Sequence, residues 1–157
     1  MLSQTVEYAL RAMTHLAALP SDAAANSETI AERTQVPKGY LSKVLRDLVV
    51  AGLIDSRRGP NGGFALARPA SRISILDVVN ATDPLKRIEH CPLGNPAHLD
   101  LCPLHRRLDD AIAMIEREFG RTSLAEVAAS SVRTSNACRT LVGLTVQRAD
   151  PHRRDAR

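Results

Sequence analysis

Two cysteines and two histidines lie close together in the middle of the chain. Cys91, His98, Cys102 and His105 fall within fifteen residues, in the spacing C-x6-H-x3-C-x2-H. Thiolate and imidazole are the ligands that soft and borderline metals prefer, and Cys102 and His105 are one helical turn apart, so they can share a face. His90 directly precedes this group and could replace either histidine. The pattern favours a metal site over the alternative that each is an ordinary core or surface residue.

Basic residues are concentrated in one segment. The 157 residues carry a formal net charge of +4, and residues 36–68 alone contain six Lys and Arg against two Asp. This excess predicts a polyanionic partner, because Lys and Arg bind phosphates or guanine edges and Ser and Tyr hydroxyls bind phosphates or bases. The candidate contacts to double-stranded DNA are Lys38, Tyr40, Ser42, Lys43, Arg46, Arg57 and Arg58.

Three short helices are expected to position the first five of these side chains. Apolar residues recur at helical spacing over residues 2–19, and Pro20 ends that pattern. A second helix is expected from a Ser27 N-cap to about Arg33, and a third ends at Gly52 in the C′ position. The apolar face of the first helix is expected at Leu2, Val6, Leu10, Met13 and Ala17. That of the third is expected at Leu41, Val44, Leu45, Leu48 and Val49.

A β-hairpin is expected to position the two remaining arginines. Residues 53–56 and 64–67 are compatible with strands, and Asn61-Gly62 between them is a strong signal for a tight turn. A helix-turn-helix followed by a hairpin is a winged helix, whose second helix fits the major groove while the wing reaches the backbone or the minor groove. The alternative is a winged helix that binds another protein, with these charges merely solvated.

Beyond the wing, Ser74 and Asp77 resemble a capping box that opens a helix to about residue 81. Residues 84–100 lack any period and form the loop that carries the cysteines. A helix over residues 102–119 follows, with Gly120 as its stop and one face that must be buried. Its apolar stripe, the candidate dimer interface, is Leu104, Leu108, Ile112, Ile115 and Phe119.

After that helix, Ser123 and Glu126 cap a short apolar stretch over residues 124–129. The fold class is therefore mainly α: a winged helix-turn-helix with a two-stranded wing, plus a long dimerisation helix. The expected divisions are a DNA-binding domain over 1–82, a metal-binding or cluster-binding loop over 83–102, the dimerisation and short following helices over 102–130, and a tail over 131–157.

Composition excludes several classes of protein. No run of apolar residues is long enough for a membrane span, and the N-terminus lacks the pattern of a signal peptide. The three cysteines are sparse and odd in number, which argues against a secreted disulfide framework and for a cytoplasmic location; Cys138 is interpreted as an ordinary free thiol. No nucleophile with a nearby base and no paired carboxylates stand out, so an enzyme is not expected.

Several short stretches resemble one known family. They are residues 5–10 (TVEYAL), Val36-Pro37, Tyr40-Leu41, residues 52–54 (GLI) and residues 58–64 (RGPNGGF). Over residues 2–127 the chain resembles the bacterial winged-helix regulators typified by the iron-sulphur cluster regulator and the nitric-oxide-sensitive repressor. The resemblance implies a homodimer held by the long helix, palindromic operators, and an iron-sulphur cluster.

The same resemblance implies three cysteine ligands and a fourth ligand that differs between members. Cys91 and Cys102 match the outer cysteines and His105 matches a histidine used by some members, but the middle cysteine is absent and His98 is the nearest replacement. Glu7 matches an acidic ligand that other members donate from the partner subunit. A [2Fe-2S] cluster with mixed ligands is the first expectation, and a zinc site or a regulator without a metal would fit the same residues.

The sequence thus predicts a homodimeric DNA-binding transcription regulator, acting as a repressor, whose DNA affinity is tuned by a metal centre that senses redox state, iron or nitric oxide. The alternative is a protein-interaction or constitutive winged-helix protein with a structural zinc. His15, two turns beyond the acidic position of the first helix, is interpreted as a surface or interface residue.

Overall fold

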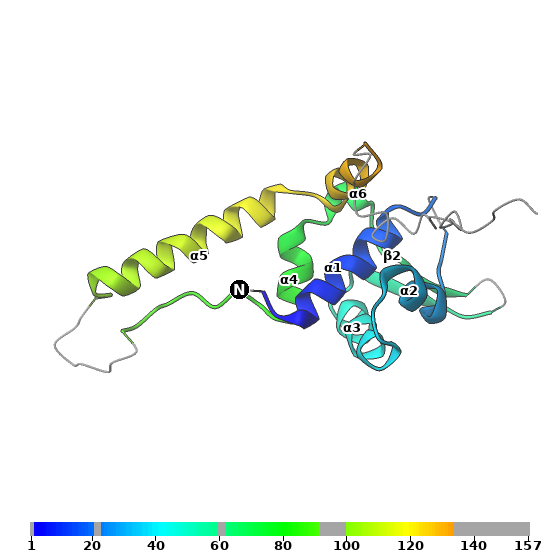
Figure 1. Ribbon diagram of the computed structural model, residues 1–157, viewed down its shortest axis with the longest axis horizontal. Coiled ribbons are helices and arrows are strands. Elements are labelled where there is room, and N and C mark those ends of the chain that lie inside the picture. Colours follow the sequence, from blue (N-terminus) through cyan, green and yellow to red (C-terminus); the bar gives the residue numbers. More distant parts are fainter. Residues whose placement is uncertain (1, 21–22, 60–61, 92–99, 134–157) are drawn as a thin grey trace, which may run out of the picture.

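The computed structural model describes residues 2–20, 23–59, 62–91 and 100–133 (Figure 1). The elements within these ranges are α1 Gln4–Ala17, α2 Ser27–Thr34, α3 Lys38–Val50, β1 Ile54–Arg57, β2 Gly63–Leu66, the 3₁₀ helix η1 Ala70–Arg72, α4 Ile75–Thr82, α5 Pro103–Arg121 and α6 Leu124–Arg133. The two strands form an antiparallel sheet. This order confirms the predicted winged helix-turn-helix with a long helix behind it.

The helix-turn-helix comprises α2 and α3. The predicted N-cap of α2 was wrong by one residue, because the Asn26 side chain, and not Ser27, accepts the N–H of Thr29 at 2.8 Å. The predicted end of α3 is confirmed. Gly52 adopts φ +67° and donates its N–H to the Val49 carbonyl at 2.9 Å, the left-handed turn that favours glycine after a helix.

The wing differs from its prediction in the length of its turn. Arg57 pairs with Gly63, so the strands lie one residue from their expected positions and residues 58–62 connect them. The N–H of Gly62 donates to the Gly59 carbonyl at 2.9 Å. The connection is thus five residues long and not the seven left between the predicted strands; Asn61 of the predicted tight turn lies outside the described residues.

The wing is attached to the segment between α1 and α2. Ala25 and Phe64 exchange backbone hydrogen bonds of 3.0 and 2.8 Å. Gly63 adopts φ +147°, and a Cβ there would lie 2.4 Å from the Ala25 carbonyl oxygen. Only glycine permits this approach, so the base of the wing is fixed to the body of the domain.

The hydrophobic core surrounds α1, which packs against α2, α3, α4 and α6. The four fully buried positions predicted for α3 are confirmed, and Val49 is half-buried. The face predicted for α1 was partly wrong, because Leu2 is 40% exposed whereas Ala9, Ala12 and Leu16 are buried. The small alanines let neighbouring elements approach this helix closely. The spacing of the large apolar side chains did not indicate that these alanines would be buried.

His15 is buried, with 4% of its surface exposed, so the interpretation of a surface or interface residue was wrong. Neither ring nitrogen has a hydrogen-bond partner among the described residues. Burial lowers the pKa of this imidazole, and the positive charge of Arg33 lowers it further. The folded protein therefore holds His15 in its neutral form.

We expect acid to destabilise the protein through His15. Its pKa is lower in the folded than in the unfolded state, so acidification from pH 7 through about 6.5 adds a proton preferentially to the unfolded chain. Replacing His15 by leucine should stabilise the fold by about 1 kcal/mol at pH 7 and by more at pH 5, since it removes unpaired buried nitrogens. Urea unfolding at both pH values measures this, and equal stabilisation at the two would contradict it.

The C-terminal half follows the predicted capping. Ser74 and Asp77 form a capping box at α4, and Ser123 and Glu126 bond in the same way at the start of α6. Gly120 is not the stop of α5, because the helix continues to Arg121. The helix predicted over residues 124–129 was too short, because α6 continues to Arg133. Residues 134–157 of the expected tail lie outside the described residues.

α5 projects away from the winged helix (Figure 1). Its C-terminal end is attached to the start of α4 by two backbone hydrogen bonds of 2.9 Å. The N–H of Ile75 donates to the Thr122 carbonyl, and the N–H of Leu124 donates to the Ile73 carbonyl. None of its residues is buried in this single chain, although one face was expected to be. Among the described residues, no helix is long and apolar enough to span a membrane.

Candidate metal centre and nucleic-acid interface

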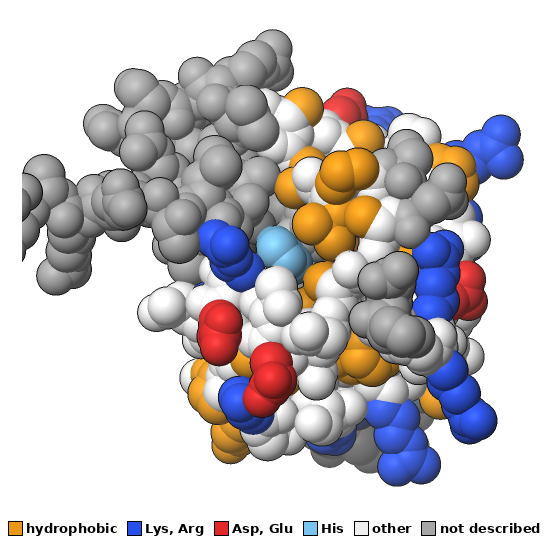
Figure 2. All heavy atoms as spheres, turned by 90° about the vertical axis from the view of Figure 1, so that its right-hand side faces the viewer, with side chains coloured by type: hydrophobic (Ala, Val, Ile, Leu, Met, Phe, Trp, Pro, Cys, Tyr) orange, Lys and Arg blue, Asp and Glu red, His pale blue; other side chains and the backbone are white. Residues whose placement is uncertain are grey.

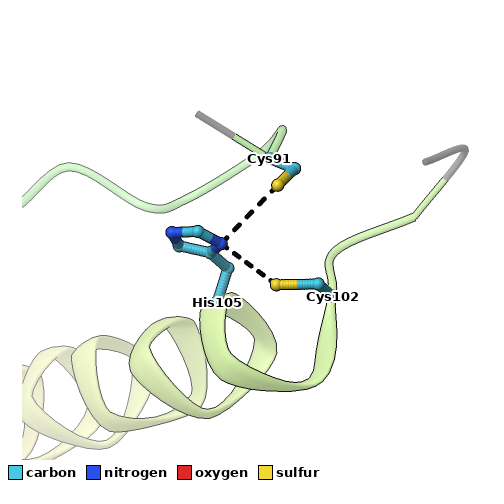
Figure 3. Close-up of side chains that lie close together, drawn as sticks. All are labelled: Cys91, Cys102 and His105. Carbon is cyan, nitrogen blue, oxygen red and sulfur yellow. Dashed lines mark hydrogen bonds between the residues drawn. The ribbon is translucent and has the colours of Figure 1, made fainter. Parts of the chain in front are cut away.

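Three of the predicted metal ligands converge at the start of α5 (Figure 3). Cys102 is the N-cap of that helix, Pro103 fixes its first turn, and His105 projects from it. The Nδ1 atom of His105 lies 3.2 Å from Cys102 Sγ and 3.7 Å from Cys91 Sγ. All three ligand atoms lie within 4.8 Å of one another and all three residues are half-buried. His98 lies outside the described residues.

These distances suit ligands of one metal ion. Metal–sulphur bonds of about 2.3 Å and metal–nitrogen bonds of about 2.0 Å at a tetrahedral angle place sulphur and nitrogen about 3.6 Å apart. The two observed separations, 3.2 and 3.7 Å, lie on either side of that value. Among the described residues, no further cysteine, histidine or carboxylate joins these three ligands. A tetrahedral ion would therefore have its fourth position left for another ligand.

Glu7, predicted as a ligand from the partner subunit, is exposed on α1 and forms an ion pair with Arg11 one turn later. His90, the alternative histidine, is exposed and is not part of the converging group. Within one chain neither residue therefore adds to the site. The role of Glu7 stays a prediction about a dimer.

An arginine that was not among the predicted site residues connects the segment before Cys91 to α5. Arg87 pairs with Asp109, which also accepts the N–H of Ile88, and these bonds hold the pKa of the Asp109 carboxyl at about 2. The available signal was spacing alone: the arginine is four residues before Cys91 and the acid four residues after His105. Nothing in the sequence indicated that the two segments would lie side by side.

The seven predicted DNA contacts are all exposed. Five lie on α3, opposite the buried face of that helix, whereas Arg57 ends β1 and Arg58 begins the turn of the wing. Tyr40 is 57% exposed, and its ring stands edge-on to Tyr8 with 5.9 Å between centroids. Figure 2, which views the molecule from the wing side, shows Lys and Arg side chains along one edge and at the lower end. The arrangement suits contact with phosphates.

Two of the basic side chains on α3 are paired with carboxylates of the same chain. Lys38 Nζ lies 2.9 Å from Glu28 Oε1, and Lys43 Nζ lies 2.9 Å from Asp47 Oδ2. The first pair lowers the pKa of Glu28 and raises that of Lys38. Glu28 could not be identified from the sequence, because α2 and α3 meet there only after the helix-turn-helix has folded. If Lys38 and Lys43 contact DNA as predicted, phosphates would compete with these carboxylates.

Replacing Glu28 by glutamine is expected to tighten DNA binding about threefold. The change releases Lys38 for a phosphate and removes a negative charge from the surface that is predicted to face DNA. Fluorescence anisotropy with a labelled duplex measures the affinity. A Glu118→Gln variant on α5, whose exposed partner is Arg121, is the control for loss of one charge elsewhere and should bind as the unaltered protein does. Equal effects of the two substitutions would contradict a local role.

A helix-turn-helix with exposed basic residues and an attached wing defines the class of winged-helix DNA-binding regulators. The comparisons specify the family. The family model described as "Rrf2: Iron-dependent Transcriptional regulator" matches residues 2–130. The chain belongs to this family, whose members are transcription regulators and not enzymes.

Individual relatives agree with this assignment. An HTH-type transcriptional regulator of Aquifex aeolicus is 31% identical over 134 residues, covering 80% of this chain and 89% of the relative. The structure of CymR, the global cysteine regulator of B. subtilis, is 23% identical with a TM-score of 0.71 and covers 83% of this chain and 97% of its own. T. potens IscR is also 23% identical with a TM-score of 0.71, covering 86% and 92%. The two structures show the same fold.

Proposed function

We propose that the protein is a cytoplasmic, homodimeric repressor that binds a palindromic operator and whose DNA affinity depends on a metal centre. The observation that carries the proposal is the convergence of Cys91, Cys102 and His105 at the free end of a helix whose other end is attached to the DNA-binding domain. A metal that joins segment 83–91 to α5 would fix that helix relative to the DNA-binding surface. The separation of two such surfaces decides whether both reach half-sites one DNA turn apart, about 34 Å.

The exposed stripe of α5 supports the homodimer. Leu104, Leu108 and Ile115 are 64, 47 and 43% exposed, whereas Ile112 and Phe119 are half-buried in the single chain. A stripe of this kind on a 19-residue helix is typical of an interface between two copies of a chain. The proposed dimer places one α5 against the other, with the DNA-binding domains outside.

Two metal centres compete for the site. The relationship to iron-dependent regulators favours a [2Fe-2S] cluster, held by Cys91, Cys102, His105 and an additional ligand such as His98 or Glu7 of the partner subunit. The spacing of the ligand atoms favours a single ion such as zinc, which would make the centre structural. In both cases the two thiolates supply charge and the histidine supplies a neutral nitrogen.

Anaerobic purification followed by absorption spectroscopy and analysis of iron, sulphide and zinc distinguishes these centres, because zinc is colourless. Operator binding is then measured before and after chelation. A coloured protein whose affinity changes on metal loss supports the regulator. A colourless protein with one zinc per chain that binds DNA equally well after chelation would contradict metal-dependent regulation and leave a constitutive winged-helix protein.

The wing is proposed to contact the DNA backbone. Replacing Arg58 by alanine should weaken binding to every duplex about tenfold and should reduce the salt dependence of binding, because each phosphate contact releases a counterion. Replacing Ser42 on α3 should instead change the preference among sequences. Anisotropy titrations at several salt concentrations measure both effects. Unaltered affinity of the Arg58 variant would remove the wing from the interface.

A further inference from the structure

The segment that carries Cys91 has no helix or strand to hold it beside α5. Residues 83–91 leave the end of α4 and, within the described chain, reach the start of α5 as an extended strand-like segment without sheet partners. Nine residues can span about 30 Å when extended, so attachment at α4 alone would leave the Cys91 thiol a large volume to explore. Some other contact must bring this thiol to within 3.7 Å of His105.

That contact is a group of charge-assisted hydrogen bonds centred on Arg87. Its Nε and Nη2 atoms donate to the two carboxylate oxygens of Asp109 at 2.7 and 2.5 Å, and Nη1 lies 3.3 Å from Glu116. The backbone N–H of Ile88 donates to the same Asp109 carboxylate at 2.9 Å. A planar guanidinium bound to both oxygens of a carboxylate fixes orientation as well as distance. Only 14% of the Asp109 side chain is exposed.

The spacing along α5 places this contact on the same face as the metal ligand. Asp109 follows His105 by four residues and Glu116 follows Asp109 by seven, so all three project from one side of the helix. The distance from Asp109 back to His105 is about one turn, or 6 Å. The three residues from Ile88 to Cys91 can cover that distance, and in the structure they bring the thiol opposite the imidazole.

We propose that Arg87, by pairing with Asp109, is a positioning residue for the metal centre: it holds the Cys91 thiol beside Cys102 and His105 before the metal binds. This role rests on the metal centre proposed above. The Arg87 side chain reaches no metal-ligand atom, so its effect passes through the path of residues 88–91. Without the pair, metal binding must also order that segment, and affinity falls by the corresponding entropy.

Cobalt(II) is a suitable probe, since its visible and near-ultraviolet bands report tetrahedral geometry and thiolate ligation. All variants carry Cys138→Ala, so only Cys91 and Cys102 supply thiols. Arg87→Ala and Asp109→Asn should each lower the cobalt affinity about tenfold to a hundredfold, the usual effect of removing a group that orients a ligand. Arg87→Lys should restore part of it, because lysine keeps the charge and loses the paired geometry.

Arg121→Ala is the matched control. It removes an exposed arginine that pairs with Glu118 on the same helix, away from the metal ligands, and should leave cobalt affinity unchanged. The double variant Arg87→Ala, Asp109→Asn should lose less cobalt affinity than the two single losses multiplied together, since both substitutions break the same pair. Equal cobalt affinity of Arg87→Ala and the Cys138→Ala protein from which it is made, or an equal loss in Arg121→Ala, would overturn the proposal while leaving the metal centre in place.

A second measurement needs no metal ion. Phenylarsine oxide bridges two neighbouring thiols: its arsenic–oxygen bond is replaced by two arsenic–sulphur bonds, and the oxygen leaves as water with both thiol protons. The Cys138→Ala protein should form the Cys91–Cys102 bridge about ten times faster than its Arg87→Ala variant, because the thiols are already close. If cobalt binds neither the Cys138→Ala protein nor any variant, the proposed metal centre is wrong. The bridging rates then decide whether Arg87 positions the Cys91 thiol, and equal rates would overturn that role as well.

Discussion

Cys91→Ala and Cys102→Ala are each expected to abolish the metal centre. The two thiolates are the only anionic ligands among the three converging residues. Each substitution leaves one thiolate and one imidazole, which would not hold an iron-sulphur core or a zinc ion at cellular concentrations. We expect bound metal to fall from stoichiometric amounts to less than about a tenth, together with loss of any colour. Metal analysis and absorption spectra of anaerobically purified protein measure this result.

The same variants test whether the centre regulates DNA binding. Their operator affinity should differ from that of the metal-loaded protein and should equal that of the protein after chelation. Cys138→Ala is the control with the same chemical change, and it should retain metal and affinity. His105→Ala should alter the spectrum more than the stability of the fold. Full metal occupancy in Cys91→Ala would place the site elsewhere.

Ile115→Asp is expected to convert the protein to a monomer. The side chain lies in the middle of the apolar stripe of α5 and is 43% exposed in the single chain. Burying an unpaired carboxylate costs several kcal/mol, and a two-fold interface buries two, so the dimer should dissociate at least about a hundredfold more readily. Because the helix has no buried residue within its own chain, the fold of the monomer should persist.

Arg117→Asp is the matched control, since residue 117 is exposed and lies on the opposite face of the same helix. Sedimentation equilibrium should show a dimer for this variant and a monomer for Ile115→Asp, with equal helix content by circular dichroism. A dimer in both would move the interface away from this stripe. The monomer should also bind a two-half-site duplex more weakly, because it loses the benefit of joint contact.

Local rules predicted much of the fold. The Schellman turn at Gly52, the capping boxes at Ser74 and Ser123 and the buried face of α3 depend on neighbours within a few residues, so the sequence shows them directly. The errors arose where distant segments decide the outcome. The environment of His15 and the length of the wing turn depend on packing between elements, which spacing along the chain does not show.

The candidate site was predictable in its chemistry and not in its geometry. Cysteine and histidine types with helical spacing indicated the Cys102 and His105 pair, because one helix turn positions both. The approach of Cys91 depends on Arg87 and Asp109, which are 22 residues apart in the chain. Likewise, Glu28 and Lys38 pair only across two helices, so the sequence alone did not show that the predicted DNA contact Lys38 already has a partner.

The projecting α5 acts as a lever arm. Its 19 residues span about 28 Å, and its attached end is at Thr122 while the metal ligands are at the other end. A tilt of about 5° at the attached end would displace Cys102 by about 2.5 Å, whereas metal–ligand distances vary by only about 0.2 Å. If the proposed metal centre forms, small rotations of the DNA-binding domain would thus be amplified at its ligands. Operator DNA should therefore change metal affinity by the same factor as the metal changes operator affinity.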